Sequence, residues 1–114
     1  MSKKKKRRTP ESCIRQWKCW LINDCQYSTE KSDSLIKKLL LLLEHMQLGY
    51  AVFSYRRKTG EDMLVRGSLM YYQRDFHRRF KWKNLNHTIP YWDKELENWR
   101  VFDLANLQGW LPEY

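Results

Sequence analysis

Glycine is scarce in this sequence, and its four residues are scattered at positions 49, 60, 67 and 109. No cluster of glycines is therefore present to form the loop that cradles a phosphate in nucleotide-binding enzymes. Histidine is equally sparse, and His45, His77 and His87 have no spacing that is typical of a metal site. Nothing in the sequence favours a catalytic cysteine–histidine pair. These absences predict a protein without a cofactor, a metal site or enzymatic activity.

Long apolar runs and a disulfide framework are also missing. The leucine run from Leu39 to Leu43 is bounded by Lys38 and Glu44 and is far too short to span a bilayer. The three cysteines, at positions 13, 19 and 25, are odd in number, and their spacing fits no zinc knuckle or ribbon. The beginning of the chain has no apolar stretch typical of a signal peptide. We therefore expect reduced thiols, a cytoplasmic location and no membrane partner.

The net charge is +9, but it is unevenly placed. Six of the basic residues follow one another near the start, namely Lys3, Lys4, Lys5, Lys6, Arg7 and Arg8. A run of this kind is usually solvated, and it raises the rate of encounter with polyanions. We interpret residues 1–9 as a disordered basic tail that contributes non-specific attraction to nucleic acid.

Two helices are predicted before residue 50. The first covers about residues 10–23, because Thr9 can cap it, Pro10 fits its first position, and apolar residues recur at helical spacing at Cys13, Trp17, Trp20 and Leu21. The second covers about residues 34–48, with Ser32 or Ser34 as its N-cap and Gly49 at a left-handed C-terminal position. Its leucines form so wide a face that it must be buried against two surfaces or against a partner.

These apolar helical faces support one interpretation of function, a protein–protein interaction module. The partner surface would consist of Trp17, Trp20, Leu39 and Leu43. Through helices 10–23 and 34–48, the protein would then self-associate or dock on a larger assembly such as a polymerase, ribosome or virion. In the other interpretation, these helices pack on each other or on the remainder of the same chain.

From Tyr50 the pattern changes to short runs rich in β-branched and aromatic residues. Gly60 lies in a turn at a position suited to positive φ, and Gly67 predicts a bulge or a sharp bend within a strand. The first predicted hairpin joins Tyr50–Arg57 to Met63–Met70, and the second joins Ile89–Trp92 to Asn98–Phe102. A helical turn at Leu104–Gln108 then precedes a short strand at Trp110–Leu111.

This outline is typical of an SH3-like antiparallel β-barrel. The expected fold class is α+β, with two helices followed by the barrel. The expected organisation is the tail at residues 1–9, a helical extension at 10–49 and the barrel at 50–114.

Two blocks of the C-terminal half carry a resemblance to a known family. The first block contains Val52–Tyr55, Lys58–Gly60 and Val65–Leu69; the second contains Ile89–Asp93 and Trp99–Leu107. Together they resemble the WYL-like family of Sm/SH3-type small barrels, over about residues 50–111. Ser68 departs from the family, which usually has threonine there. The resemblance implies an SH3-like barrel, a ligand- or nucleic-acid-binding regulatory role, and a bacterial host cell, with the protein encoded by the bacterium or by a phage.

The segment between the two hairpins is rich in both cations and rings. Residues 71–83 contain five aromatic side chains and the basic residues Arg74, Arg78, Arg79, Lys81 and Lys83. Arginine and lysine neutralise phosphates, while exposed rings such as Trp82 stack on bases, so this composition is typical of a single-stranded nucleic-acid site. The alternative is that the rings seal one end of the barrel while the charges face water. We expect a nucleic-acid-binding accessory or regulatory factor, with DNA and RNA both open.

Two further pairs have a structural and a binding interpretation. Arg66 and Arg100 are expected on strands, where they can stack on Trp99 or pair with an aspartate, Asp93 or Asp103. Trp92 and Trp99 can pack across two strands or form an exposed aromatic pocket. For both pairs the sequence favours the structural interpretation.

Overall fold

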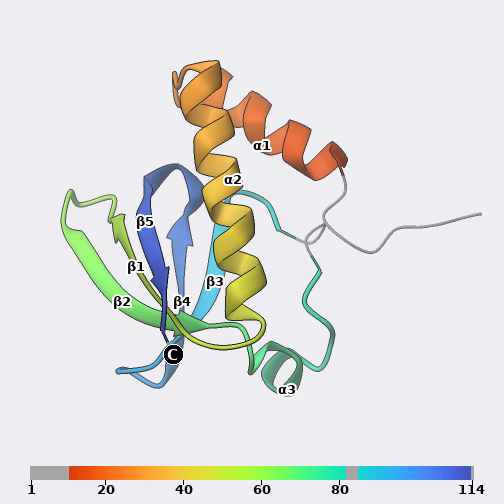
Figure 1. The fold of residues 1–114 in the computed structure, drawn as a ribbon, viewed down its shortest axis with the longest axis vertical. Coiled ribbons are helices and arrows are strands. Elements are labelled where there is room, and N and C mark those ends of the chain that lie inside the picture. The colour runs from red at the N-terminus through yellow and green to blue at the C-terminus, as the bar shows by residue number, and fades with distance from the viewer. Residues whose placement is uncertain (1–10, 82–84, 114) are drawn as a thin grey trace, which may run out of the picture.

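The computed structural model describes residues 11–81 and 85–113. Two helices, α1 (Glu11–Asn23) and α2 (Thr29–Met46), precede the strands β1 (Ala51–Arg56) and β2 (Asp62–Ser68). A short helix α3 (Tyr72–Phe76) follows, and then β3 (Thr88–Asp93) and β4 (Asn98–Asp103). The 3-10 turn η2 (Leu104–Asn106) leads into the last strand, β5 (Leu107–Pro112) (Figure 1). The predicted α+β fold class is confirmed.

The second helix begins five residues earlier than the sequence indicates. Its N-cap is Ser28, whose Oγ accepts a hydrogen bond of 3.0 Å from the backbone N–H of Lys31. The predicted cap Ser32 instead lies inside the helix and is fully buried. The expected left-handed terminus is also wrong, because Gln47 ends the helix in a right-handed conformation and Gly49 does not adopt a positive φ. A well-placed serine oxygen outweighs the apolar pattern in fixing where this helix begins.

The five strands form one antiparallel sheet with the order β4-β3-β2-β1-β5. Strand β1 pairs with both β2 and β5, and β2 also pairs with the end of β3 through Gly67 and Ser68. The turn between β1 and β2 contains Gly60 with a φ of 92°, as predicted. The predicted second hairpin is confirmed as β3 and β4. The outer strands β4 and β5 each have one strand neighbour within the described residues.

One continuous core joins the helices to the sheet. Helix α2 lies across the strands (Figure 1), and the tertiary contacts place it against β5, β1 and α1. Its buried side chains meet the strand rings of Phe53, Tyr55, Tyr91 and Phe102 in a single apolar cluster, to which it contributes Leu35, Ile36, Leu39, Leu42, Leu43 and Met46. No helix within the described residues is long and apolar enough to cross a membrane.

The predicted partner surface needs correction, because most of it belongs to this core. Trp17 is 3% exposed, and Leu39 and Leu43 are 0% exposed. Trp20 is only half-buried, but it stacks on His87 at 4.3 Å between ring centroids. The wide leucine face is thus buried against two surfaces of the same chain, α1 on one side and the sheet on the other.

Gly67 is required by packing and not by a bulge. The pairing of β1 with β2 runs without interruption from Ala51↔Gly67 to Arg56↔Asp62, so the predicted bulge is absent. A Cβ atom added at Gly67 would lie 2.8 Å from ring atoms of both Phe53 and Tyr91. The missing side chain therefore lets two core rings approach the β2 backbone. The irregularity in the sheet lies elsewhere, between Ser54 and Tyr55 in the pairing of β1 with β5.

The first prediction concerns this close approach. Gly67→Ala should lower the free energy of unfolding by about 1–3 kcal/mol, because neither ring can move without disturbing the core. Gly109→Ala is the matched control: this glycine also lies in a strand, and an added Cβ there meets nothing within 4 Å. Urea denaturation of both variants measures the difference. Equal stability of the two variants would contradict the packing argument.

The second prediction separates a core role of the leucine face from a partner role. Leu39→Ala should destabilise the protein by about 2–5 kcal/mol, because it leaves a cavity between α2 and the sheet. Leu41→Ala, on the same helix but 52% exposed, should change stability by at most about 0.5 kcal/mol. Thermal unfolding and light scattering check both. A change in oligomeric mass for Leu39→Ala without loss of stability would restore the partner interpretation.

Candidate functional site

The rings of the segment between β2 and β3 pack mainly on one another. Tyr72 is 7% exposed, and its ring contacts Phe76 at 4.8 Å and Phe80 at 5.3 Å between centroids. Phe76 in turn lies 4.9 Å from Trp99 on β4. These side chains cover one end of the sheet and do not form a row of free stacking surfaces. For the rings, the structural interpretation is therefore the better one.

Arg74 is held by its neighbours. Its Nε donates to Asp75 Oδ1 at 2.7 Å, and its guanidinium lies 4.4 Å from the ring centre of Tyr71. Asp75 also accepts a 2.7 Å hydrogen bond from the indole N–H of Trp99. The bonds from Arg74 and Trp99 lower the pKa of Asp75, and the bond that Arg74 donates to Asp75 raises the pKa of Arg74. Asp75 thus ties α3 to β4, and Arg74 is bound to Asp75.

The other predicted cations of this segment remain available. Arg78, Arg79 and Lys81 are exposed, and among residues 11–81 and 85–113 they have no acidic partner. They lie just beyond α3, whose last residue is followed by His77 in a left-handed conformation with φ of 58°. Trp82, Lys83 and the predicted tail cations Lys3 to Arg8 lie outside the described residues. Phosphate contact by this segment stays a prediction.

The two tryptophans of the second hairpin pack across the strands. Trp92 and Trp99 are direct partners in the pairing of β3 with β4, and their ring centroids lie 5.8 Å apart at 73°. Tyr71 adds a further edge contact to Trp92 at 5.4 Å. The structural interpretation of this pair is confirmed, and no open cage of aromatic side chains is left between them.

A cleft lies instead between the β1–β2 turn and β4. It has a volume of about 550 Å³ and is lined by Tyr55, the turn residues Arg56 to Thr59, His87, Thr88, β4 from Trp99 to Asp103, and Asn106. A neighbouring hollow of about 420 Å³ shares Arg56 and Asn106 with it and extends to Tyr27 and α2. We call the two together the basic cleft, because six of the lining residues are basic: Lys31, Lys38, Arg56, Arg57, Lys58 and Arg100.

The charge of the basic cleft is strongly one-sided. Asp103 is the single carboxylate among the described lining residues. Arg56 pairs with Asp62 at 3.0 Å and Arg57 with Glu61 at 3.1 Å, but these pairs are largely exposed. The bonds from Arg56 and from Gln108 lower the pKa of Asp62, so this carboxylate is ionised at neutral pH. Exposed ion pairs contribute about 0–1 kcal/mol, and a bound polyanion can therefore compete for both arginines.

The lysines of the basic cleft are held loosely. Lys31 lies 4.1 Å above the ring centre of Tyr27, and Lys38 donates to the backbone oxygen of Gln108 at 2.9 Å. Lys58 is exposed on the turn, and none of the described residues pairs with it. These ammonium groups can reorient toward a phosphate at little cost, because a lysine is a flexible point charge.

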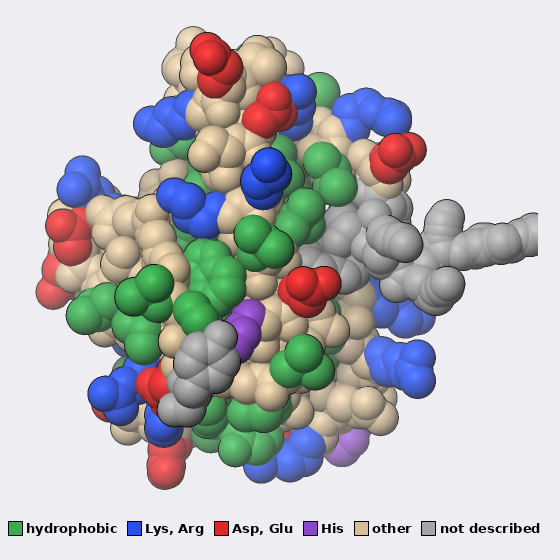
Figure 2. All heavy atoms as spheres, viewed as in Figure 1, with side chains coloured by type: hydrophobic (Ala, Val, Ile, Leu, Met, Phe, Trp, Pro, Cys, Tyr) green, Lys and Arg blue, Asp and Glu red, His purple; other side chains and the backbone are tan. Residues whose placement is uncertain are grey.

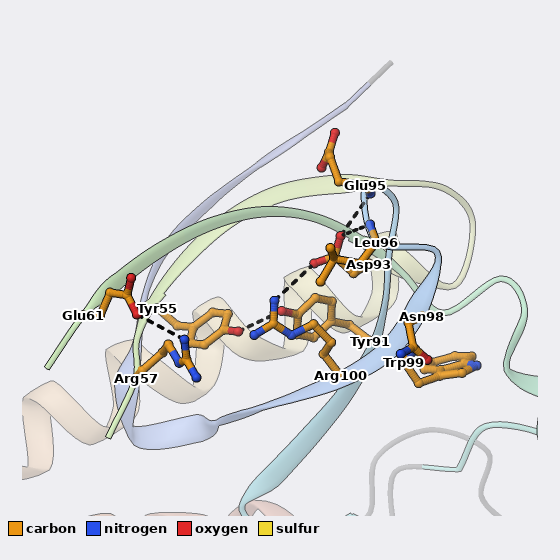
Figure 3. Close-up of polar contacts among 10 residues, drawn as sticks. All are labelled: Tyr55, Arg57, Glu61, Tyr91, Asp93, Glu95, Leu96, Asn98, Trp99 and Arg100. Carbon is orange, nitrogen blue, oxygen red and sulfur yellow. Dashed lines mark hydrogen bonds and ion pairs between the residues drawn. The ribbon is translucent and has the colours of Figure 1, made fainter. Parts of the chain in front are cut away.

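At its inner end the cleft reaches buried polar groups of the sheet (Figure 3). The hydroxyls of Tyr55 and Tyr91 lie 2.8 Å apart, and Arg100 lies 3.8 Å from the carboxylate of Asp93. Asp93 is nearly buried and accepts hydrogen bonds of 3.0 Å from the N–H groups of Glu95 and Leu96. The predicted pairing of Arg100 with Asp93 is thus confirmed. Arg66 pairs instead with Glu95 and Glu113.

The residues of the basic cleft come from segments that are far apart in the sequence, and sequence reasoning did not bring them together. One signal was present, since Arg56, Arg57 and Lys58 are consecutive and fall at a predicted turn. The predicted hairpin register could also have placed Arg100 opposite Tyr91, as the structure does. No cluster of His, Cys, Asp and Glu suited to a metal occurs among the described residues.

A five-stranded antiparallel sheet with tight turns and a 3-10 turn before the last strand defines the class of small SH3-like barrels. Comparison with family models gives the particular family: a model described as WYL_2, Sm-like SH3 beta-barrel fold, matches residues 39–108, which is more than half of the chain. The chain belongs to this family, and the predicted resemblance is confirmed. The matched segment begins inside α2. Neither curated proteins nor solved structures gave a significant match.

The third prediction concerns the buried tyrosine pair. Burial, together with the hydrogen bond between Tyr91 and Tyr55, raises the pKa of Tyr91 above its ordinary value of 10.0. In the unfolded chain the phenol ionises near pH 10, whereas the folded chain keeps it neutral, so stability is complete below pH 10 and falls as the pH rises further. Thermal unfolding should show this fall, and Tyr91→Phe should make it shallower. An unchanged slope in the variant would contradict the assignment.

Proposed function

We propose that this protein is a non-enzymatic, nucleic-acid-binding accessory or regulatory factor, and that the basic cleft holds the sugar–phosphate backbone. The observation that carries the proposal is the convergence of six basic side chains on one cleft with a single carboxylate in its lining. They come from α2, the end of β1 with the turn that follows it, and β4, and the fold brings these three segments together. The family's small barrel supplies the scaffold.

The physical basis is counterion release. Each phosphate neutralised by a lysine or arginine frees condensed ions, so affinity falls steeply as salt is added. A concave surface lined by charges of one sign also focuses its field and raises the rate of encounter with a polyanion. The guanidinium groups of Arg56 and Arg57 each have donors beyond those used by their acidic partners, and a phosphate can accept from them.

The ring content of the cleft favours a single strand. Two half-buried rings, Tyr27 and Trp99, contribute to the lining between the cations. Bases that are not paired can stack on such rings, whereas a duplex hides the faces of its bases. The exposed cations Arg78, Arg79 and Lys81 can extend the contact beyond Trp99, which lies between the cleft and the rings of α3.

The fourth prediction tests the cleft by salt dependence. The double variant Lys31→Gln with Lys58→Gln should bind single-stranded DNA or RNA more weakly, because two phosphate contacts are lost. The slope of log K against log salt should fall in magnitude by about 1.4, at about 0.7 per contact on a single strand. Fluorescence anisotropy of a labelled oligonucleotide across a salt series measures this change.

The matched control is Arg15→Gln with Lys37→Gln, which removes the same charge from exposed helical positions outside the cleft lining. None of the four residues forms an ion pair with a described residue. If the two double variants lose the same amount of affinity for the oligonucleotide, the cleft has no specific role and the attraction is non-specific. If Arg78→Gln with Arg79→Gln loses more than the cleft variant, the segment after α3 is the main site. No binding at low salt would end the proposal.

The alternative function is docking on a larger assembly through the helices. Most of the surface predicted for it is buried in the core of this chain. Figure 2 shows hydrophobic side chains over the middle of the face that carries α2, with lysines and arginines mostly around them. The exposed apolar residues of α2 and its C-terminal end are Leu41 at 52% and Leu48 at 82%. Single exposed leucines are common on monomeric proteins. No specific observation therefore favours a protein partner over a nucleic acid.

A further inference from the structure

At the inner end of the basic cleft, two tyrosine hydroxyls have only each other as hydrogen-bond partners among the described residues. The hydroxyls of Tyr55 and Tyr91 are 2.8 Å apart, and a bond between them uses one of their two hydrogens. The remaining hydrogen has no acceptor among the described residues, although Tyr55 is 3% and Tyr91 is 0% exposed. Buried donors nearly always have a partner in folded proteins. Since Tyr55 lines the cleft, an acceptor can reach the pair from there.

Two guanidinium groups flank this pair. Figure 3 shows the hydroxyls of Tyr55 and Tyr91 directed toward each other, with Arg57 on one side and Arg100 on the other. Arg100 is only partly satisfied by its carboxylate, because the distance of 3.8 Å to Asp93 exceeds that of a hydrogen bond. Arg57 is tied to Glu61 on the exposed side of the turn, at 3.1 Å. Both cations therefore retain donors for a ligand in the cleft.

These groups match the chemistry of one compact anion. A phosphate presents several strong acceptor oxygens, and it binds most tightly where guanidinium forks and a neutral donor meet. A terminal phosphate carries about −1.5 to −2 at neutral pH, whereas a phosphate within a strand carries one charge. The carboxylates of Asp93 and Glu61 each offset one arginine, and Lys58 adds a further cation at the rim of the cleft.

We propose that Tyr55, Arg57 and Arg100 form a pocket for a single phosphate group at the inner end of the basic cleft. The proposal deepens the proposed function and rests on it, because the phosphate in question is the end of a bound strand. The same pocket takes a free phosphate ion by the same contacts. A protein with such a pocket prefers the phosphorylated end of a nucleic acid over a hydroxyl end.

The test compares one short single-stranded oligonucleotide that carries a 5′-phosphate, a 3′-phosphate or hydroxyls at both ends. At fixed ionic strength, the full-length protein should bind one phosphorylated form about tenfold more tightly than the hydroxyl form, which corresponds to one charged hydrogen-bonded group. Tyr55→Phe should abolish this preference, so that the phosphorylated and hydroxyl forms bind the variant equally. Arg100→Lys, which keeps the charge opposite Asp93 but removes the guanidinium fork, should reduce it.

Tyr72→Phe is the matched control, because it removes a hydroxyl from a buried ring outside the cleft and should keep the full preference. A second arm uses inorganic phosphate alone. Phosphate should raise the melting temperature of the wild type more than chloride at equal ionic strength, and Tyr55→Phe should remove the excess.

The outcomes separate the two proposals. Strand binding without any preference for a phosphorylated end, and without an excess effect of inorganic phosphate, overturns the pocket while the proposed function stands. A preference that survives in Tyr55→Phe also overturns the pocket, because the end is then recognised elsewhere. An excess effect of inorganic phosphate that depends on Tyr55, in a protein that binds no strand, supports the pocket and overturns the proposed function.

Discussion

Helix α2 fills the concave side of the sheet with a face of leucine, isoleucine and methionine side chains, and most other features of the molecule depend on that contact. The rings of Phe53, Tyr55, Tyr91 and Phe102 meet this face in one cluster. Their close packing is possible because Gly67 has no side chain between the β2 backbone and the rings of Phe53 and Tyr91. The same helix also buries Trp17 of α1 and places Lys31 and Lys38 beside the last strand. Apolar burial thus fixes where the cations lie.

The basic cleft is a consequence of where this apolar core ends. Along β1 the core side changes from Phe53 to the hydroxyl-bearing Tyr55, and after β1 ends at Arg56 the chain continues into Arg57 and Lys58 of the turn. On β4 the change is from Phe102 to Arg100, which needs the nearly buried Asp93 to remain there. Polar groups at the edge of a core carry a desolvation cost unless they find partners. At the cleft, Asp93 supplies such a partner to Arg100, and Tyr55 and Tyr91 supply one to each other.

Local patterns in the sequence predicted the fold well because they act over short distances. The turn at Gly60, both hairpins and the helical turn before β5 depend on neighbouring residues and were confirmed. The start of α2 was missed because a serine oxygen at Ser28 outweighs apolar spacing. The cleft was missed for a different reason. Lys31, Arg57 and Arg100 meet only through the sheet order, which no local pattern specifies. For the ring-rich segment around Tyr72 both interpretations stayed open, because composition cannot distinguish packed rings from exposed ones.

Strand β4 forms one edge of the sheet, and the basic cleft runs beside it. An unpaired edge is a template on which a second chain can add a strand, which is the first step toward aggregation. A second copy that approached this edge would place its own arginines and lysines beside Arg56, Arg57, Lys58 and Arg100. Like charges at short range repel. The cations of the cleft would therefore oppose the pairing of two copies along this edge, and neutralising them would remove that repulsion.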